Sequence, residues 1–403
     1  MNNKKKILFV DDDPKVLQAI RRNVRMMRDE WESEFAQSGK KALEMMEQNP
    51  PDLIVSDMRM PGMDGAQLFN EVKNLFPDTI RIILSGQTDE KSLMQAAGST
   101  HQILSKPCEF EALKEVINRA CTLRDSLDNP ALKRVVSQLQ SIPSFPQIYN
   151  DVMAELKSPG VTIENVGKII SRDIGMSTKI LQLANSAYFG FSSKIGSADH
   201  AVQILGLDTI QAMVISYHIF SKIDPSKLKH VSIDQVWDHS MKVSGLAMKI
   251  AKAEKMDCKT QYFTFTAGLV HDIGMLIIAQ NLPDQFKQAL SLAKTDKIKL
   301  CDAEAQILNT SHEKVAAYLL GLWGLPDPIV EAVAFHHSLE NYPGSGLSPL
   351  TFLHVADVFE NERNKNLGFP DYCSGLHEDY LKKVGAWERI PQWKEICQNL
   401  DQE

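Results

Sequence analysis

The chain has 403 residues, enough for two or three domains, and its hydrophobic (43%) and charged (24%) fractions are ordinary for a soluble globular protein. A net charge of −7 and the lack of a basic recognition helix argue against DNA as a partner. The six cysteines form no CxxC pair, which indicates reduced thiols. No signal peptide is recognised, and the most apolar late stretch, 263–279, is too short and polar to span a bilayer. We therefore expect a cytoplasmic protein without a membrane partner.

Four short apolar runs in the first 106 residues predict buried parallel strands, because helical patterns separate them. The runs cover 7–10, 53–56, 80–84 and 101–104. In an open α/β sheet the ligand site lies beyond the carboxyl ends of the strands, so the polar residues that end these runs should converge. They are Asp11, Asp12, Asp57, Ser85 and Lys106.

This set of side chains suits the handling of a phosphoryl group. Three carboxylates repel one another unless a hard cation lies between them, and Mg²⁺ suits one or two carboxylates plus water and phosphate oxygens. Asp11 and Asp12 would lie on the metal side, and Asp57 would reach the same ion. A carboxylate beside Mg²⁺ can accept a phosphoryl group and become an aspartyl phosphate. Lys106 and the Ser85 hydroxyl would then bind the phosphoryl oxygens.

The same residues stand in motifs that resemble the receiver domain of bacterial two-component response regulators, over about residues 4–125. The motifs are VDDDP at 10–14, SDMRMPGMDG at 56–65, LSG at 84–86 and SKP at 105–107. The resemblance implies a flavodoxin-like fold with a five-stranded parallel sheet of order 2-1-3-4-5, and a sensor histidine kinase as partner. It also implies Asp57 as phosphoacceptor, a cis bond before Pro107, and these further roles: Asp11, Asp12 and the Arg59 backbone carbonyl as Mg²⁺ ligands, and Ser85 with Lys106 as the switch pair.

One position departs from the receiver pattern. Receivers often carry an aromatic switch residue three positions before the lysine, where this chain has Ile103. The aromatic–hydroxyl coupling is therefore in doubt, whereas phosphorylation is still expected. The alternative is a flavodoxin-like domain with incidental acidic residues at its strand ends, but several separate motifs in the right order favour the receiver.

The pattern changes after the receiver, which we assign to residues 1–125. A break at 128–130 lies in a predicted helical linker over 126–140. From there, helical spacing of apolar residues predicts an all-α output domain over 141–360. Residues 361–403 are more polar, and we expect them to form a helical C-terminal extension.

Histidines and aspartates of this second half form a candidate metal site. Two adjacent pairs stand out, His271 with Asp272 and His336 with His337. Imidazole and carboxylate together suit Mn, Fe, Zn or Ni, and dinuclear sites of this kind hydrolyse phosphoesters. The alternative is that each histidine only hydrogen-bonds its neighbours. The complete candidate set is His239, His271, Asp272, His312, His336, His337 and Asp357.

The order His, His-Asp, Asp resembles the HD superfamily of metal-dependent phosphohydrolases. That resemblance places His239, His271, Asp272 and Asp357 at the first metal, and His312, His336 and His337 at a second. Over about residues 135–340 the chain more closely resembles the HDOD domain, an HD-related output domain regarded as regulatory. The matching segments are IPSFP at 142–146, SRD at 171–173, LANSAYFG at 183–190, AVQILG at 201–206 and LWGLP at 322–326.

Cyclic-di-GMP phosphodiesterases of the HD-GYP type differ from this chain at three places. They carry a lysine where this chain has Met275, and a glutamate where it has Gln235. Their Gly-Tyr-Pro loop is represented only by Tyr342 and Pro343, which follow the paired histidines sooner and lack the glycine. Loss of the lysine removes a cation that would meet a phosphate, so substrate binding is weakened while metal binding could survive.

The sequence therefore predicts a response regulator with an HDOD output, and two classes of output stay open. Met275 favours a module that binds a protein or a nucleotide ligand without turnover. The retained metal ligands favour a metal-dependent phosphohydrolase acting on a cyclic dinucleotide or similar phosphoester. Phosphorylation adds a charge of about −1.5 to −2, which would draw Ser85 and Lys106 inward. The linker would pass this on through changed domain contacts or formation of a homodimer.

Overall fold

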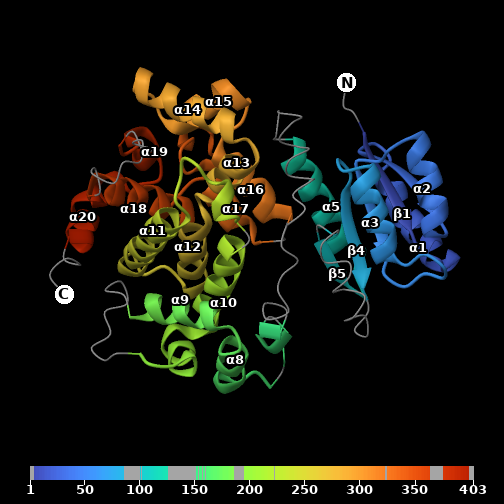
Figure 1. Ribbon diagram of the computed structural model, residues 1–403, viewed down its shortest axis with the longest axis horizontal. Helices are drawn as coiled ribbons and strands as arrows, with labels where there is room; N and C mark the ends of the chain where they lie inside the picture. The colour runs from blue at the N-terminus through green and yellow to red at the C-terminus, as the bar shows by residue number, and fades with distance from the viewer. Residues whose placement is uncertain are drawn as a thin grey trace. The chain divides into compact units, whose positions relative to one another are not determined.

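The computed structural model describes residues 4–85, 100, 102–125, 151–152, 154–156, 158, 160–185, 195–221, 223–322, 325–363 and 375–398. The chain divides into two compact units, with the main boundary between positions 144 and 145 (Figure 1). The predicted linker over 126–140 and the HDOD-like segment at 142–146 lie outside the described residues.

The N-terminal unit is built on a parallel sheet of order β2-β1-β3-β4-β5, which confirms the predicted fold. Its strands are β1 (Lys5–Val10), β2 (Trp31–Ala36), β3 (Leu53–Asp57), β4 (Ile80–Ser85) and β5 (Gln102–Ser105). The four apolar runs correspond to β1, β3, β4 and β5. The remaining strand, β2, is an edge strand of sequence WESEFA, in which Trp31 and Ala36 are buried but the residues between them are exposed or only partly buried, so no apolar run marks it.

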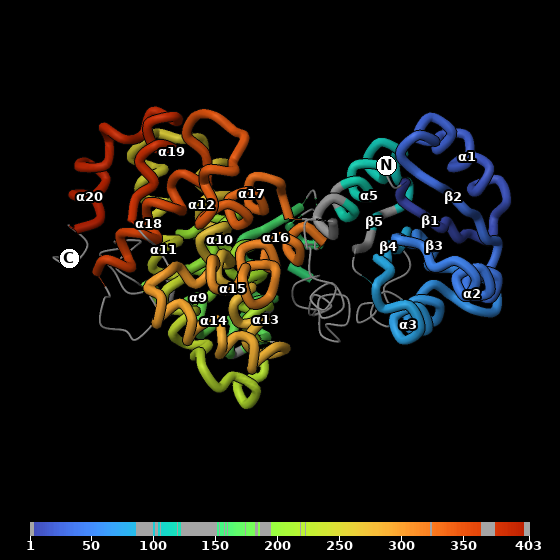
Figure 2. Tube along the Cα trace, turned by 90° about the horizontal axis from the view of Figure 1, so that it is seen from above, coloured from blue at the N-terminus to red at the C-terminus, as the bar shows by residue number. Residues whose placement is uncertain are grey.

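Helices cover both faces of this sheet. They are α1 (Pro14–Val24), the short η1 (Arg25–Met27), α2 (Gly39–Gln48), α3 (Gly65–Leu75) and α5 (Phe110–Asp125). Figure 2 shows α1 and α5 on one side of the sheet and α2 and α3 on the other. The third acid of the VDDDP motif has a structural role, because the Asp13 side chain accepts a hydrogen bond from the Lys15 backbone N–H and so caps α1.

The described part of the C-terminal unit is helical, as predicted. Its helices are α8 (Ile163–Ile170), α9 (Ile174–Ala184), α10 (Ala198–Ser221), η2 (Pro225–Lys227), α11 (Ile233–Ala253), α12 (Cys258–Val270), α13 (Ile273–Asn281), α14 (Pro283–Asp296), α15 (Leu300–Leu308), α16 (His312–Leu322), α17 (Asp327–Phe335), η3 (Leu339–Asn341), α18 (Pro349–Arg363), α19 (Glu378–Lys383), η4 (Trp387–Arg389) and α20 (Ile390–Gln398). Helix α12 packs against α10, α11, α17 and α18 and so forms the centre of the unit.

Two helical stretches, Ala198–Ser221 and Cys258–Asn281, are long and apolar enough to cross a membrane by length and composition alone. The expectation that the second stretch is too short was therefore wrong, since α12 and α13 follow one another almost without interruption. The most apolar window of that stretch is 94% buried inside the unit. Burial against other helices accounts for its apolar composition, as expected of a core helix.

Candidate functional site

The residues predicted for phosphoryl handling meet at the carboxyl edge of the sheet. Carboxylate oxygens of Asp11, Asp12 and Asp57 all lie within 4.8 Å of one another. The Lys106 amine lies 2.8 Å from Asp57 Oδ1 and 3.1 Å from Asp11 Oδ2. Ser85 ends β4 and is buried, paired in register with Ser105 of β5. The predicted cis bond between Lys106 and Pro107 is confirmed.

The surrounding chain fixes the Asp57 carboxylate. The backbone N–H of Met58 donates to Asp57 Oδ1 over 2.8 Å. Helix α3 begins so close to this strand end that a Cβ on Gly65 would lie 2.5 Å from the Asp57 carbonyl oxygen, so only glycine fits there. Arg59 lies two residues beyond Asp57 and its side chain is exposed. The side chain of Ile103 lies outside the described residues.

The electrostatics of this edge favour a bound cation. Burial raises the pKa of Asp57, with the neighbouring Asp11 adding to the rise and Lys106 opposing it. Burial would lower the pKa of Lys106, but its bonds to Asp57 and Asp11 outweigh burial and raise it. One amine therefore pairs with two of the three carboxylates, Asp11 and Asp57. Such a set fits the ligand chemistry of Mg²⁺.

The second candidate site is assembled from helices spread over more than 100 residues of sequence. His239 comes from α11, His271 and Asp272 from the junction of α12 and α13, and Asp357 from α18. Another three side chains come from the start of α16 and the end of α17: His312, His336 and His337. Their potential ligand atoms form two groups, His239 with His271 and Asp357, and Asp272 with the other three histidines. All seven predicted residues are thus brought together.

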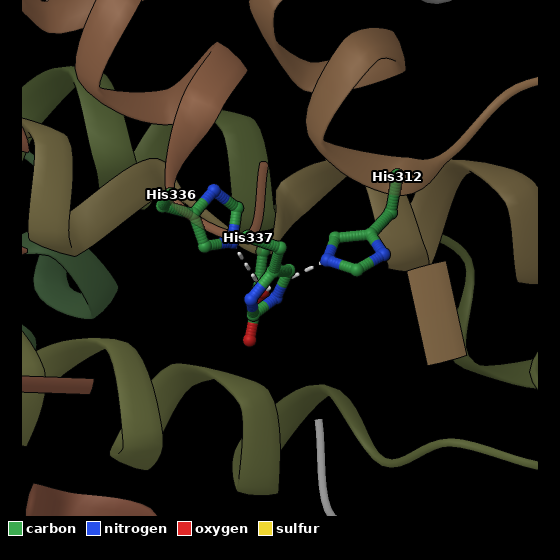
Figure 3. Close-up of side chains that lie close together, drawn as sticks. His312, His336 and His337 are labelled. Atoms are coloured by element: carbon green, nitrogen blue, oxygen red, sulfur yellow. Dashed lines mark ion pairs between the residues drawn. The ribbon is translucent and has the colours of Figure 1, made fainter. Parts of the chain in front are cut away.

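Asp272 lies between the two groups. Its Oδ2 atom is 3.3 Å from His271 Nε2 and 3.7 Å from His239 Nε2. Its Oδ1 atom is 3.7 Å from His312 Nε2 and 3.8 Å from His336 Nε2. The sequence assigned Asp272 to the first metal alone, whereas in the structure each of its oxygens faces a different group. Figure 3 shows the rings of His312, His336 and His337 turned toward one another.

Three of the histidines are held by their far nitrogen, Nδ1. The Nδ1 atom of His271 bonds the carbonyl oxygen of Gly268 over 2.8 Å, and that of His336 bonds the carbonyl of Val333 over 2.7 Å. A carbonyl only accepts, so the proton belongs on Nδ1 and Nε2 faces the cluster. Both Nε2 atoms are buried and neither makes a hydrogen bond with the described residues. Orphaned, inward-facing imidazole nitrogens of this kind fit metal ligation.

Sequence reasoning missed Glu304, which holds the third histidine. Glu304 is fully buried in α15. Its Oε2 atom accepts from the backbone N–H of His312 over 2.8 Å and from His312 Nδ1 over 2.7 Å. A carboxylate behind an imidazole is the usual partner of a metal-bound histidine. Only the packing of α15 against the start of α16 reveals it, because no motif includes this glutamate.

Charges within the cluster shift its pKa values strongly. Burial would lower the pKa of His271, but Asp272 and Asp357 raise it to about 9. Burial would likewise lower the pKa of His312, but Glu304 and Asp272 raise it to about 10. Burial would raise the pKa of Asp272, but the His271 imidazole holds it well below its usual range. Protons on the histidines balance the negative charge of the carboxylates here, and a bound cation would take the place of these protons.

Gly274 lets the two halves of the cluster approach. A Cβ on Gly274 would lie 2.0 Å from the carbonyl oxygen of His312, which no side chain can tolerate. The glycine of the His-Asp-Ile-Gly motif therefore permits contact between α13 and the start of α16. This contact brings His312 next to Asp272.

Family comparisons agree with this division. A model of the response regulator receiver domain matches residues 7–118, and a model of the HDOD domain matches residues 142–339. The chain is a receiver domain fused to an HDOD domain. It is therefore a response regulator with an HD-type output.

Individual relatives match one part or the other. Transcriptional regulatory protein GlrR of Escherichia coli K12 is 35% identical over 118 residues, 28% of this chain and 26% of that protein. An uncharacterized protein of Treponema pallidum is 23% identical over 212 residues, 52% of this chain and 40% of that protein. The chain thus spans well under half the length of these curated relatives.

A solved structure supports the helical fold. An HDOD domain protein with unknown function from Geobacter sulfurreducens superposes with a TM-score of 0.52 at 23% identity, covering 72% of this chain and 95% of that one. At this identity the likeness concerns the fold alone.

Proposed function

We propose that a sensor histidine kinase phosphorylates Asp57 and that this step controls the HDOD unit. The observation that carries the proposal is the Lys106 amine 2.8 Å from Asp57, within a group of three carboxylates. Asp11, Asp12, Asp57 and the Arg59 backbone carbonyl would hold Mg²⁺, which neutralises charge on the acceptor and the incoming phosphoryl group when bound. Lys106 and Ser85 would bind the phosphoryl oxygens and so carry the change to β4 and β5.

Labelling with acetyl phosphate tests this assignment. The wild-type protein should take up one phosphoryl group in the presence of Mg²⁺, and Asp57→Asn should take up none while keeping its circular dichroism spectrum. Asp52→Asn is a suitable control, because Asp52 lies at the opposite end of β3 and accepts from the Lys6 backbone N–H. Labelling that persisted in Asp57→Asn would move the acceptor to Asp11 or Asp12.

For the output, we propose that the helical unit holds a transition-metal centre of Fe, Mn, Zn or Ni. His239, His271 and Asp357 would hold one ion, and His312, His336 and His337 another, with Asp272 between them. Such a centre, when loaded, can activate water toward a phosphoester or hold the ligand of a sensing domain. The convergence of all seven side chains supports this assignment.

We favour an output that acts by binding a protein or a nucleotide ligand. The HDOD fold and the buried, uncharged Met275 beside Asp272 support this choice. The second candidate is a metal-dependent phosphohydrolase, which the Asp272 geometry supports because a carboxylate between two ligand groups suits a dinuclear site. Cytoplasmic location, a downstream partner that is not DNA and assembly into a homodimer are further parts of the proposal.

Metal analysis followed by a hydrolysis assay separates the two outputs. Protein expressed in metal-replete medium is measured for Fe, Mn, Zn and Ni and then incubated with cyclic-di-GMP. Absence of these metals would exclude the metal-dependent phosphohydrolase as the function of the output. Bound metal without hydrolysis would support the binding module, and hydrolysis that disappears in Asp272→Asn would support the enzyme instead.

A further inference from the structure

A small cavity adjoins the candidate metal centre on the side of His336 and His337. It has a volume of about 100 Å³, and its other polar lining residues are Lys299, His354 and His377. We call it the Lys299 pocket. Among the described residues that line it there are one amine, four imidazoles and no carboxylate. The positive charge of the lysine amine and the N–H donors of the lining favour a bound anion.

Lys299 has hydrogen-bonding capacity to spare. It directly precedes α15 and is partly buried. Its amine makes one long hydrogen bond, 3.4 Å, to the carbonyl oxygen of His337. No carboxylate of the described residues forms an ion pair with it. A lysine amine has three N–H donors, so two remain for a ligand while the bond to His337 fixes their position.

The two histidines from outside the metal cluster have different roles. His354 uses both ring nitrogens, with Nδ1 donating to the His336 carbonyl over 3.3 Å and Nε2 accepting from the His377 backbone N–H over 3.1 Å. His354 therefore lines the pocket but has no ring nitrogen left to bind a ligand. His377 accepts the Tyr380 backbone N–H at Nδ1 over 3.2 Å, which leaves Nε2 as the donor. The exposed Glu340 carboxylate lies 3.7 Å from that Nε2 atom.

We propose that the Lys299 pocket binds a phosphate-sized oxyanion, with Lys299 and His377 as its donors. The volume of about 100 Å³ leaves room for several water molecules. Pockets for drug-sized ligands measure about 300–1,000 Å³. The pocket therefore takes one phosphoryl group or inorganic phosphate, and a whole cyclic dinucleotide does not fit inside it.

The position of this pocket connects a bound anion to the proposed function of the helical unit. It shares His336 and His337 with the candidate metal centre, so an anion bound there lies beside that centre. The interpretation of the anion as a phosphoester group rests on the proposed metal centre, whereas anion binding itself depends only on the pocket.

Calorimetric titration of the full-length protein with inorganic phosphate tests the proposal, at constant ionic strength with chloride as the reference anion. Wild-type protein should bind phosphate, and Lys299→Gln should weaken binding at least about tenfold, as expected for loss of a charged donor. Lys294→Gln is the matched control, because Lys294 is an exposed lysine of α14 outside the pocket. His377→Asn should weaken binding by a smaller factor while an asparagine still caps α19.

Three results would contradict the proposed phosphate site. The first is no phosphate binding at millimolar concentration, and the second is an equal loss of phosphate affinity in Lys299→Gln and Lys294→Gln. The third is wild-type phosphate affinity in Lys299→Gln. Adenosine monophosphate and cyclic-di-GMP are titrated alongside to identify the source of the anion. Tighter binding of the monophosphate than of phosphate supports a phosphoester group, and binding of phosphate alone supports the free ion. Binding of cyclic-di-GMP that is lost in Lys299→Gln would likewise support a phosphoester group, because one phosphodiester can enter the pocket while the rest of the ligand stays outside.

Elemental analysis of the same preparations keeps the two proposals apart. Phosphate binding in protein that lacks transition metal would contradict the metal centre and leave the pocket supported. Bound metal without phosphate binding would contradict the pocket and leave the metal centre supported. Unfolding midpoints of the variants show whether Lys299→Gln retains the wild-type fold.

Discussion

Replacement of Glu304 by glutamine should weaken metal binding without touching a proposed ligand. Glu304 is fully buried, and its Oε2 atom receives both the backbone N–H and the Nδ1 proton of His312. Glutamine has nearly the same shape, but its neutral amide holds the imidazole less firmly and makes Nε2 less basic. Loss of such an outer partner typically costs about 10–100-fold in metal affinity. This corresponds to about 1.4–2.7 kcal/mol of binding free energy.

The assay is a competition titration of chelator-treated protein with Zn²⁺ in the presence of a chromogenic chelator. Glu254→Gln serves as the matched control, because Glu254 accepts a 2.7 Å hydrogen bond from Trp393 Nε1 at the end of α11, away from the cluster. That control should lower the unfolding midpoint and leave Zn²⁺ affinity unchanged. Equal Zn²⁺ affinity in Glu304→Gln and wild type would refute the assigned role of Glu304.

Three further outcomes follow from the same geometry. Gly274→Ala should lower stability by about 1–3 kcal/mol and reduce metal content, because its Cβ meets the His312 carbonyl; an unchanged melting temperature would contradict this. Chelation of the metal should lower the wild-type melting temperature, since a ligand at 100 times its Kd stabilises by about 2.7 kcal/mol, and Asp272→Asn should lose that response. Lys106→Met should raise Mg²⁺ affinity measured by calorimetry, because the amine 2.8 Å from Asp57 no longer competes with the ion; unchanged or weaker binding would count against it.

The sequence revealed most about the parts of the molecule that follow short-range rules. Apolar runs located β1, β3, β4 and β5, and the residues after them converge because parallel strands end at one edge. Strand β2 was not predicted, because an edge strand of sequence WESEFA has no continuous apolar face. The pairing of Lys106 with both Asp11 and Asp57 needed coordinates, since two of these residues are 95 positions apart.

The helical site shows a different limit. Its candidate ligands were recognisable by residue type and order, but their division into two groups around Asp272 depends on how six helices pack. Glu304 and Lys299 could not be found in that way. One acts through the side chain of His312 and the other through a cavity, and both relations arise only when α15 lies against its neighbours.

The burial of the two candidate sites argues that they would hold an ion differently. In the receiver unit Asp12 is exposed and the Lys106 side chain is 32% exposed, so solvent reaches the carboxylates and a weakly held Mg²⁺ can exchange. In the helical unit His271 is completely buried and Asp357 is 1% exposed. An ion enclosed by these imidazoles and carboxylates leaves only when protons or a helix displacement release it. Metal that stays with the protein through desalting therefore reports on the helical unit, whereas Mg²⁺ must be supplied whenever the receiver is assayed.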